Sequence, residues 1–183
     1  MTTKHYLRLA LCTSGLLATL WAINTASASG ATPQTGQGAT HQHDDHHAGV
    51  NKRGDKVMGF AHDKTTHHFR LRTDGGLIEV EAKDPDDTKS RDQIRTHLQH
   101  IAQKFTAGDF TAPMLIHAKT PPGVPTMKQL KTAIKYQFEE TARGGQVRLV
   151  TSNSKAITAI HKFLRFQIAD HRTGDTTKIT KAP

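Results

Sequence analysis

Cysteine and tryptophan are almost absent from this sequence of 183 residues. The only cysteine is Cys12 and the only tryptophan is Trp21, so both fall within the first 28 residues. We interpret residues 1–28 as a secretory signal peptide that is cleaved. The remaining chain then has no thiol, which excludes disulfide bonds, a cysteine nucleophile and cysteine metal ligands.

The first 28 residues have the three parts of a signal peptide. Lys4 and Arg8 precede a mostly apolar run from 9 to 23, and Ala26-Ser27-Ala28 forms a small-x-small cleavage site. The run is shorter and more interrupted than a membrane span, which needs roughly 20 apolar residues. We therefore expect a periplasmic or secreted protein after cleavage near Ala28.

The sequence also lacks the motifs of common enzyme classes. It contains no G-x-S-x-G, no P-loop and no G-x-G-x-x-G after a strand. It has no H-E-x-x-H, C-x-x-C or C-x-x-C-H motif either. An enzyme of unknown class stays open as an alternative, with Asp63 or Asp170 and a neighbouring histidine as its acid–base pair.

Histidine, in contrast, is abundant. The chain has 13 histidines, and only His5 precedes residue 29, which gives about three times the ordinary usage. Residues 29–56 are rich in Gly, Thr, Gln, Ala and His and predict a disordered linker. Its histidines His41, His43, His46 and His47 flank two aspartates, a density that binds copper or zinc without a fold. The alternative is a merely soluble, histidine-rich spacer.

A second histidine group leads into the first predicted strand. His62 and Asp63 precede the pair His67 and His68. Side chains alternate along a strand, so His67 and His68 are expected on opposite faces. Asp63 suits a metal ligand or a carboxylate that orients a histidine. We predict a metal site with His62, His67 and His68 as direct ligands and with His171 as a further candidate, the alternative being polar strand-edge residues.

The other histidines are interpreted mainly as core residues. His117 and His161 lie among apolar residues, where a histidine is more often structural than a ligand. His97 aligns with Phe163 in the internal repeat described next, so it is not part of a duplicated site.

The domain from 57 to 175 contains an internal repeat, about 67–109 and 136–175. The Gly-Gly pairs that start at 75 and 144 lie 69 positions apart, and the Gly-Asp pairs that start at 108 and 174 lie 66 apart. Each repeat has the pattern of a β-hairpin followed by an amphipathic helix. We predict an α+β fold in which duplicated β-β-α units give an antiparallel sheet of about four strands with two helices on one face. Residues 176–183 are expected to be a loose tail.

The charge balance suggests a second kind of function. The net charge is +9, and Lys4 and Arg8 of the signal peptide carry only two of these charges. An exported protein seldom meets nucleic acid, so anionic lipids or envelope polymers are the nearer partners. A metal-free, basic module that binds such envelope components is therefore the alternative to metal binding. The sequence does not indicate an oligomeric state.

Several stretches also carry a resemblance. They are Asp63 to Phe69, Asp92-Gln93-Ile94-Arg95, Pro121 to Pro125 and Phe163 to His171. Across 59–175 the chain resembles a group of small exported bacterial proteins of unassigned function, which in places carry an aspartate carbamoyltransferase label. The motifs do not support that label, because the Ser-Thr-Arg-Thr-Arg phosphate-binding run of those enzymes is missing and the chain is about half their length. The resemblance supports the domain limits.

These observations favour an exported metal-binding protein. Histidine is enriched in a chain that has no thiol after cleavage, and Met58 and Met114 add thioethers. The predicted cofactor is a copper or zinc ion, with copper preferred.

Overall fold

The computed structural model describes residues 37–182, and its side chains from Asp44 onward. The predicted signal peptide and the side chains of His41 and His43 lie outside this part of the chain. The elements in chain order are α1 (Gln37–Met58), the 3-10 turn η1 (His62–Lys64), β1 (Thr65–Arg72), β2 (Gly75–Ala82), α2 (Thr88–Thr106), α3 (Thr111–His117), α4 (Val124–Gln129), η2 (Lys131–Ala133), β3 (Lys135–Thr141), β4 (Gly144–Val150) and α5 (Ser154–His171). In the stretch that the structure describes, every helix is too short or too polar to cross a membrane.

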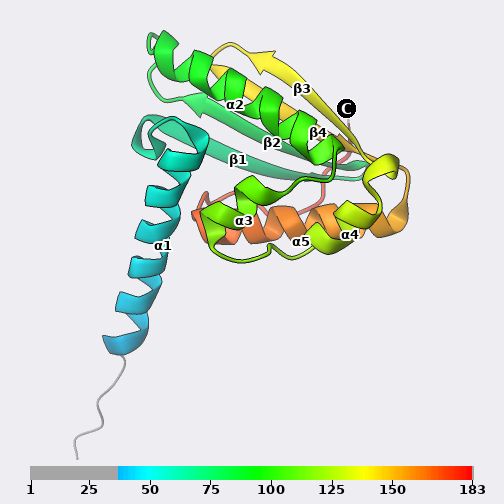
Figure 1. Cartoon of the computed structure of the whole chain (residues 1–183), viewed down its shortest axis with the longest axis horizontal. Helices are drawn as coiled ribbons and strands as arrows, with labels where there is room; N and C mark the ends of the chain where they lie inside the picture. The colour runs from blue at the N-terminus through cyan, green and yellow to red at the C-terminus, as the bar shows by residue number, and fades with distance from the viewer. Residues whose placement is uncertain (1–36, 183) are drawn as a thin grey trace, which may run out of the picture. The chain divides into compact units, whose positions relative to one another are not determined.

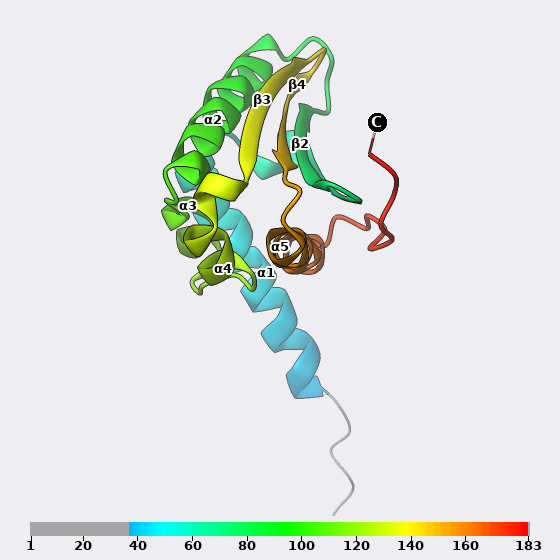
Figure 2. The ribbon, with the colours of Figure 1, turned by 90° about the vertical axis from the view of Figure 1, so that its right-hand side faces the viewer.

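The strands form one antiparallel sheet in the order β1-β2-β4-β3. Helices α2 and α5 lie against the same face of this sheet (Figures 1 and 2). Helix α2 packs mainly on β3 and β4, whereas α5 packs on β1 and β2. Each long helix therefore covers the hairpin of the other repeat. The predicted α+β fold is confirmed.

The pairing of the two central strands is two-fold symmetric. Gly76 of β2 pairs with Leu149 of β4, and Val80 pairs with Gly145. Gly145 and Leu149 lie 69 positions after Gly76 and Val80 and are their repeat equivalents. The pair Gly76–Leu149 is therefore equivalent to the pair Gly145–Val80. The register thus places a two-fold axis between β2 and β4, as expected from the 69-residue repeat.

Glycine is required where these strands and helices approach most closely. A Cβ atom at Gly144 would lie 2.1 Å from the carbonyl oxygen of Val80. We expect Gly144→Ala to lower the free energy of unfolding by about 3 kcal/mol, because the contact is with rigid backbone. Gly59 is the control, since it has a φ of +81° but open space around it, and its alanine variant should lose only about 1 kcal/mol. Urea unfolding of both variants tests this, and equal losses would contradict it.

Helix α1 occupies residues that the sequence analysis assigns to a disordered linker, so that prediction is wrong for residues 37–56. Val50, Gly54 and Met58 recur every four residues and are buried together on one helix face. This face contacts α3 and α5. The Arg53 Nε atom also donates a hydrogen bond of 2.8 Å to the carbonyl oxygen of Ile116. Tertiary packing therefore stabilises a helix that its polar composition does not predict.

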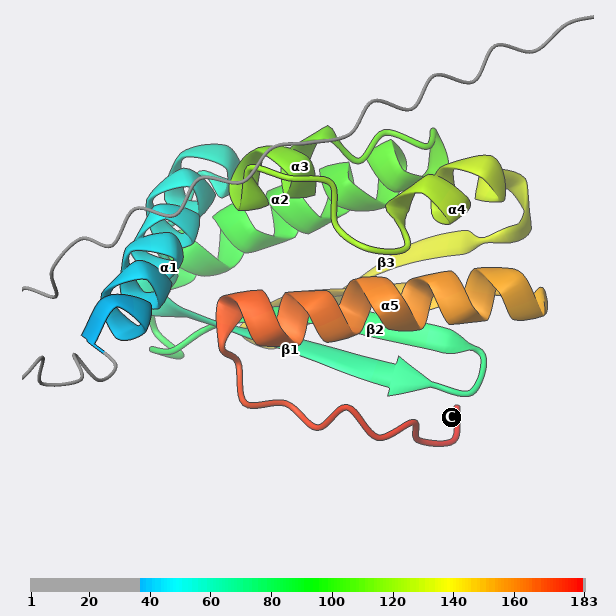
Figure 3. The same ribbon diagram turned by 90° about the horizontal axis from the view of Figure 1, so that it is seen from below.

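The C-terminal segment is also more ordered than the predicted tail. Thr180 N–H donates to the Leu71 carbonyl, and Thr73 N–H donates to the Thr180 carbonyl, each at 3.0 Å. Further back, the Asp175 carboxylate accepts a hydrogen bond of 2.9 Å from the Phe69 N–H. The segment thus runs along the edge of β1 (Figure 3), and the prediction of a loose tail is corrected for residues 176–182.

Candidate functional site

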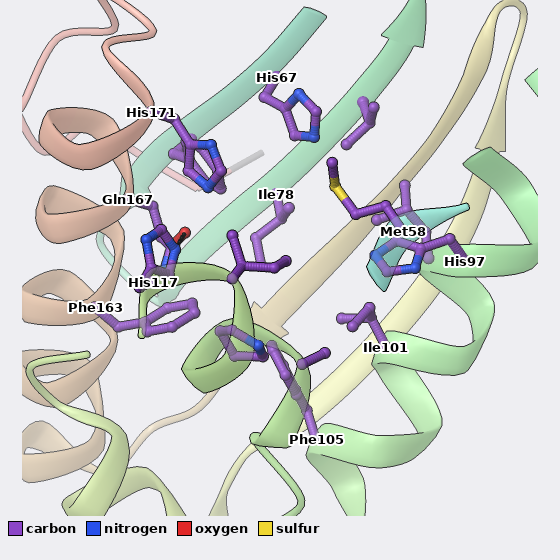
Figure 4. A pocket seen from close by; sticks show the side chains of 16 residues that line it. Met58, His67, Ile78, His97, Ile101, Phe105, His117, Phe163, Gln167 and His171 are labelled. Carbon is purple, nitrogen blue, oxygen red and sulfur yellow. Dashed lines mark hydrogen bonds between the residues drawn. The ribbon is translucent and has the colours of Figure 1, made fainter. Parts of the chain in front are cut away.

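A cavity of about 60 Å³ lies between the sheet and helices α2, α3 and α5. Most of its walls are apolar side chains, such as Ile78, Leu98, Phe105 and Phe163. We call it the core cavity, because these side chains are buried. Four imidazoles and one thioether also line it, from His67, His97, His117, His171 and Met58 (Figure 4).

Five different elements bring these side chains together. His67 is on β1 and His97 is on α2, whereas His117, His171 and Met58 are the last residues of α3, α5 and α1. Ala118 and Arg172 follow the two terminal histidines with a φ of +52°, so the chain leaves each helix directly after its histidine. The site therefore depends on where three helices end.

Two of the imidazole rings are stacked. The ring centroids of His67 and His171 are 5.6 Å apart, with the planes 4° from parallel. Two imidazoles on one ion have centroids at most about 6.3 Å apart, given a metal–nitrogen bond of about 2.0 Å and the size of the ring. Because a nitrogen lone pair lies in the plane of its ring, one of the two stacked rings must turn before both can bind one ion. His117 is also near, with its centroid 4.9 Å from that of His171 and its ring edge-on.

These imidazoles are neutral at neutral pH. Burial lowers the pKa of His67 and of His97 from 6.5 to about 4, and the pKa of His171 to about 3. The charge that neighbouring histidines would carry lowers the three pKa values further. A neutral imidazole has a nitrogen lone pair, which is the form that binds a metal.

One of these nitrogens has no partner. The Nε2 atom of His67 is buried and makes no hydrogen bond. Leaving a buried polar group unpaired costs roughly 1–3 kcal/mol. In Figure 4 the sulfur of Met58 lies between the His67 and His97 rings. The unpaired nitrogen and the thioether thus belong to the same end of the core cavity.

His117 is held differently. Its Nδ1 atom lies 2.5 Å from Oδ2 of Asp170, and its Nε2 atom lies 2.9 Å from the amide oxygen of Gln167. Burial lowers the pKa of His117 in spite of these contacts. Asp170 also bonds to His46 Nε2 at 3.0 Å. The structure thus pairs Asp170 with histidines. A neutral His117 donates to Asp170 through Nδ1, and its Nε2 atom is bonded only when the Gln167 amide turns its nitrogen, which has no other partner, toward it.

The internal symmetry gives a comparison for the histidines within the same chain. Strand positions are related by 69 residues and helix positions by 66. The equivalent pairs are His67 and Tyr136, His171 and Phe105, and His97 and Phe163.

The aromatic members pack as a core cluster. Phe105 has its ring centroid 5.6 Å from that of Tyr136 and 6.1 Å from that of Phe163. Aromatic side chains therefore suffice to fill these positions. Histidines add nitrogen lone pairs at a place where packing alone does not require them, which favours a chemical role for the cluster.

A second cavity of about 300 Å³ adjoins the first. We call it the surface cavity, because Lys83 and Arg172 in its lining are exposed and most of its other lining residues are partly exposed. It shares Met58, His67 and His171 with the core cavity. His47, His62 and His68 line the surface cavity but not the core cavity.

The predicted ligands are thus divided. The structure places His67 and His171 at the core cavity, and it places His62, His68 and His47 at the surface cavity. Of the other predicted ligands, His46 and Asp63 line neither cavity, and the side chains of His41 and His43 lie outside the described part of the chain. His46 binds Asp170, and Asp63 is exposed with its main-chain carbonyl accepting a hydrogen bond from Lys83.

The sequence analysis missed His97 and His117 as members of the site. Their signal was weak, because a lone histidine among apolar residues is usually structural. The alignment of His97 with Phe163 was the available clue.

Comparisons of the chain with family models, curated proteins and solved structures find no match. Among the described residues, no three histidine, cysteine, aspartate or glutamate side chains form a group that could hold a metal ion. Any metal at the core cavity would therefore need a different ligand set, such as two imidazoles and a thioether.

Proposed function

We propose that this protein is an exported copper-binding protein that holds Cu(I) with His67, His171 and Met58. One observation carries the proposal. Two neutral imidazoles lie at a centroid spacing that one ion can bridge once one ring turns, and the buried Nε2 atom of His67 has no partner in a cavity that the Met58 thioether also lines. Export is part of the proposal, since the predicted signal peptide lies outside the described residues.

The choice of Cu(I) over zinc follows from the number and softness of the ligands. Structural zinc sites take four ligands, and thioether sulfur favours Cu(I). Cu(I) is stable with two or three soft ligands in apolar surroundings. The side chains of His67, His171 and Met58 supply such a set, and the walls behind them are mainly apolar.

An anaerobic competition titration tests the proposal. The untagged chain carries Cys12→Ser, so that the thiol cannot bind copper, and it competes with bicinchoninate for Cu(I). We expect the parent to take Cu(I) from the dye, and Met58→Leu to bind Cu(I) at least about tenfold more weakly. Zinc binding should not depend on Met58. Failure of the parent to compete, or full affinity in Met58→Leu, would contradict the proposed site.

The basic-surface alternative stays a prediction. Arg143 and Arg148 are ion-paired with Glu81 and Asp74, at 2.5 Å and 3.1 Å. These two cations are therefore partly neutralised. The described residues show no feature that favours anionic lipid or polymer over a solubilising surface.

A further inference from the structure

The surface cavity lies directly beside the proposed copper site. Met58, His67 and His171 line both cavities, so the three proposed ligands form their common wall. An ion that reaches the surface cavity is therefore next to its final ligands without crossing the hydrophobic core. Of the histidines that line the surface cavity but not the core cavity, His62 and His68 are therefore candidates for the first contact with an ion.

His62 and His68 share one hydrogen-bond pattern. The Nδ1 atom of His62 lies 2.8 Å and 3.0 Å from the two carboxylate oxygens of Asp55. The Nδ1 atom of His68 lies 2.9 Å from Oδ1 of Asp175. In a neutral imidazole that donates through Nδ1, the lone pair is on Nε2. A carboxylate behind the histidine is the usual support of a metal-ligating imidazole.

Both carboxylates are themselves fixed. Asp55 on α1 also accepts a hydrogen bond of 2.7 Å from the His62 N–H. Asp175 also accepts hydrogen bonds from the Phe69 N–H at 2.9 Å and from the Thr173 hydroxyl at 2.7 Å. The two supports therefore come from α1 and from the C-terminal segment, both of which dock on the domain around this cavity.

The two histidines are accessible from solvent. Their side chains are 40% and 36% exposed, in contrast to the buried Nε2 atom of His67. Lys83 and Arg172 also line the surface cavity, so its charge does not by itself attract a cation. Any attraction for a soft ion must come from the imidazole lone pairs.

We propose that His62 and His68 form a capture site for Cu(I), from which the ion passes to His67, His171 and Met58. This inference rests on the proposed function. The transfer is a ligand exchange, in which one imidazole nitrogen replaces another on an ion that keeps its oxidation state. His62 and His68 set the rate of loading, whereas the ligands at the core cavity set the affinity.

Stopped-flow loading from the Cu(I)–bicinchoninate complex tests the capture site. The variant is His62→Gln/His68→Gln, in which each glutamine amide can still donate to its aspartate. His100→Gln is the matched control, because His100 is exposed and lines neither cavity. We expect the double variant to load at least about tenfold more slowly at unchanged equilibrium affinity, and the control to behave as the parent.

The possible outcomes separate the two proposals. A double variant that loads at the parent rate overturns the capture site and leaves the proposed function intact. A double variant that loses equilibrium affinity shows that His62 or His68 is a ligand of the final site. This result also overturns the capture site. A parent that takes no Cu(I) overturns both proposals.

Discussion

Replacing both His67 and His171 by phenylalanine is expected to abolish Cu(I) binding while the chain keeps its fold. The other half of the molecule has Tyr136 and Phe105 at the equivalent positions, so aromatic rings fit these places. The variant removes both nitrogen ligands, and we expect Cu(I) affinity to fall at least about a hundredfold. It also removes the unpaired Nε2 atom of His67, so stability at pH 7 should not fall.

The matched control is His100→Phe. His100 has Phe166 as its equivalent in the other repeat, but it is exposed and lines neither cavity. This single variant should therefore bind Cu(I) as the parent does. Bicinchoninate competition gives the affinity, and urea unfolding shows whether each variant is folded. A folded double variant with parent affinity would show that the ion binds elsewhere, for example at the histidines of α1.

The regular part of the fold could be predicted because both repeats carry strong local signals. The 69-residue offset indicated two hairpins, and the same offset relates the β2–β4 pairs in the structure. Local capping also marks both helix entries, since Asp87 caps α2 and Asn153 caps α5 through side-chain hydrogen bonds. Alternation along β1 is consistent with only His67 lining the core cavity while His68 binds Asp175, although both histidines line the surface cavity.

Helix α1 could not be predicted in this way, because its stability depends on residues far away in the sequence. Arg53, for example, bonds to the carbonyl of Ile116, which is 63 positions away. The candidate site also depends on residues that are far apart in the sequence, since three of its five side chains belong to the last residues of separate helices. The position of His97 was apparent from the repeat, but the mismatch with Phe163 was interpreted as the absence of a duplicated site. Within a symmetric fold, such a mismatch marks where the two halves differ in chemistry.

The metal-free protein is expected to lose stability steeply between pH 7 and pH 5. The folded-state pKa values of His67 and His97 are about 4, and that of His171 is about 3, whereas an unfolded histidine has a pKa of about 6.5. Below pH 6.5 the unfolded chain therefore binds protons that the folded chain does not, so stability falls with pH. At about 1.4 kcal/mol for each pKa unit, the three groups together give a loss of roughly 5 to 6 kcal/mol between pH 7 and pH 5.

The contribution of these histidines to the free energy of unfolding is complete above pH 6.5 and is lost as the pH falls toward 3 to 4. Asp170 and Asp175 also have lowered pKa values, but carboxylates of this kind lose their contribution only below about pH 4. Between pH 7 and pH 5, the change in stability therefore comes from the histidines and not from these carboxylates. Urea unfolding in the presence of a chelator measures the loss, and His67→Phe/His171→Phe should show a clearly smaller loss than the parent, because only His97 and His117 remain of the histidines whose pKa is lowered by burial. An equal pH dependence in parent and variant would mean that these imidazoles are already charged in the folded protein, and the core cavity would then lack the lone pairs that Cu(I) binding requires.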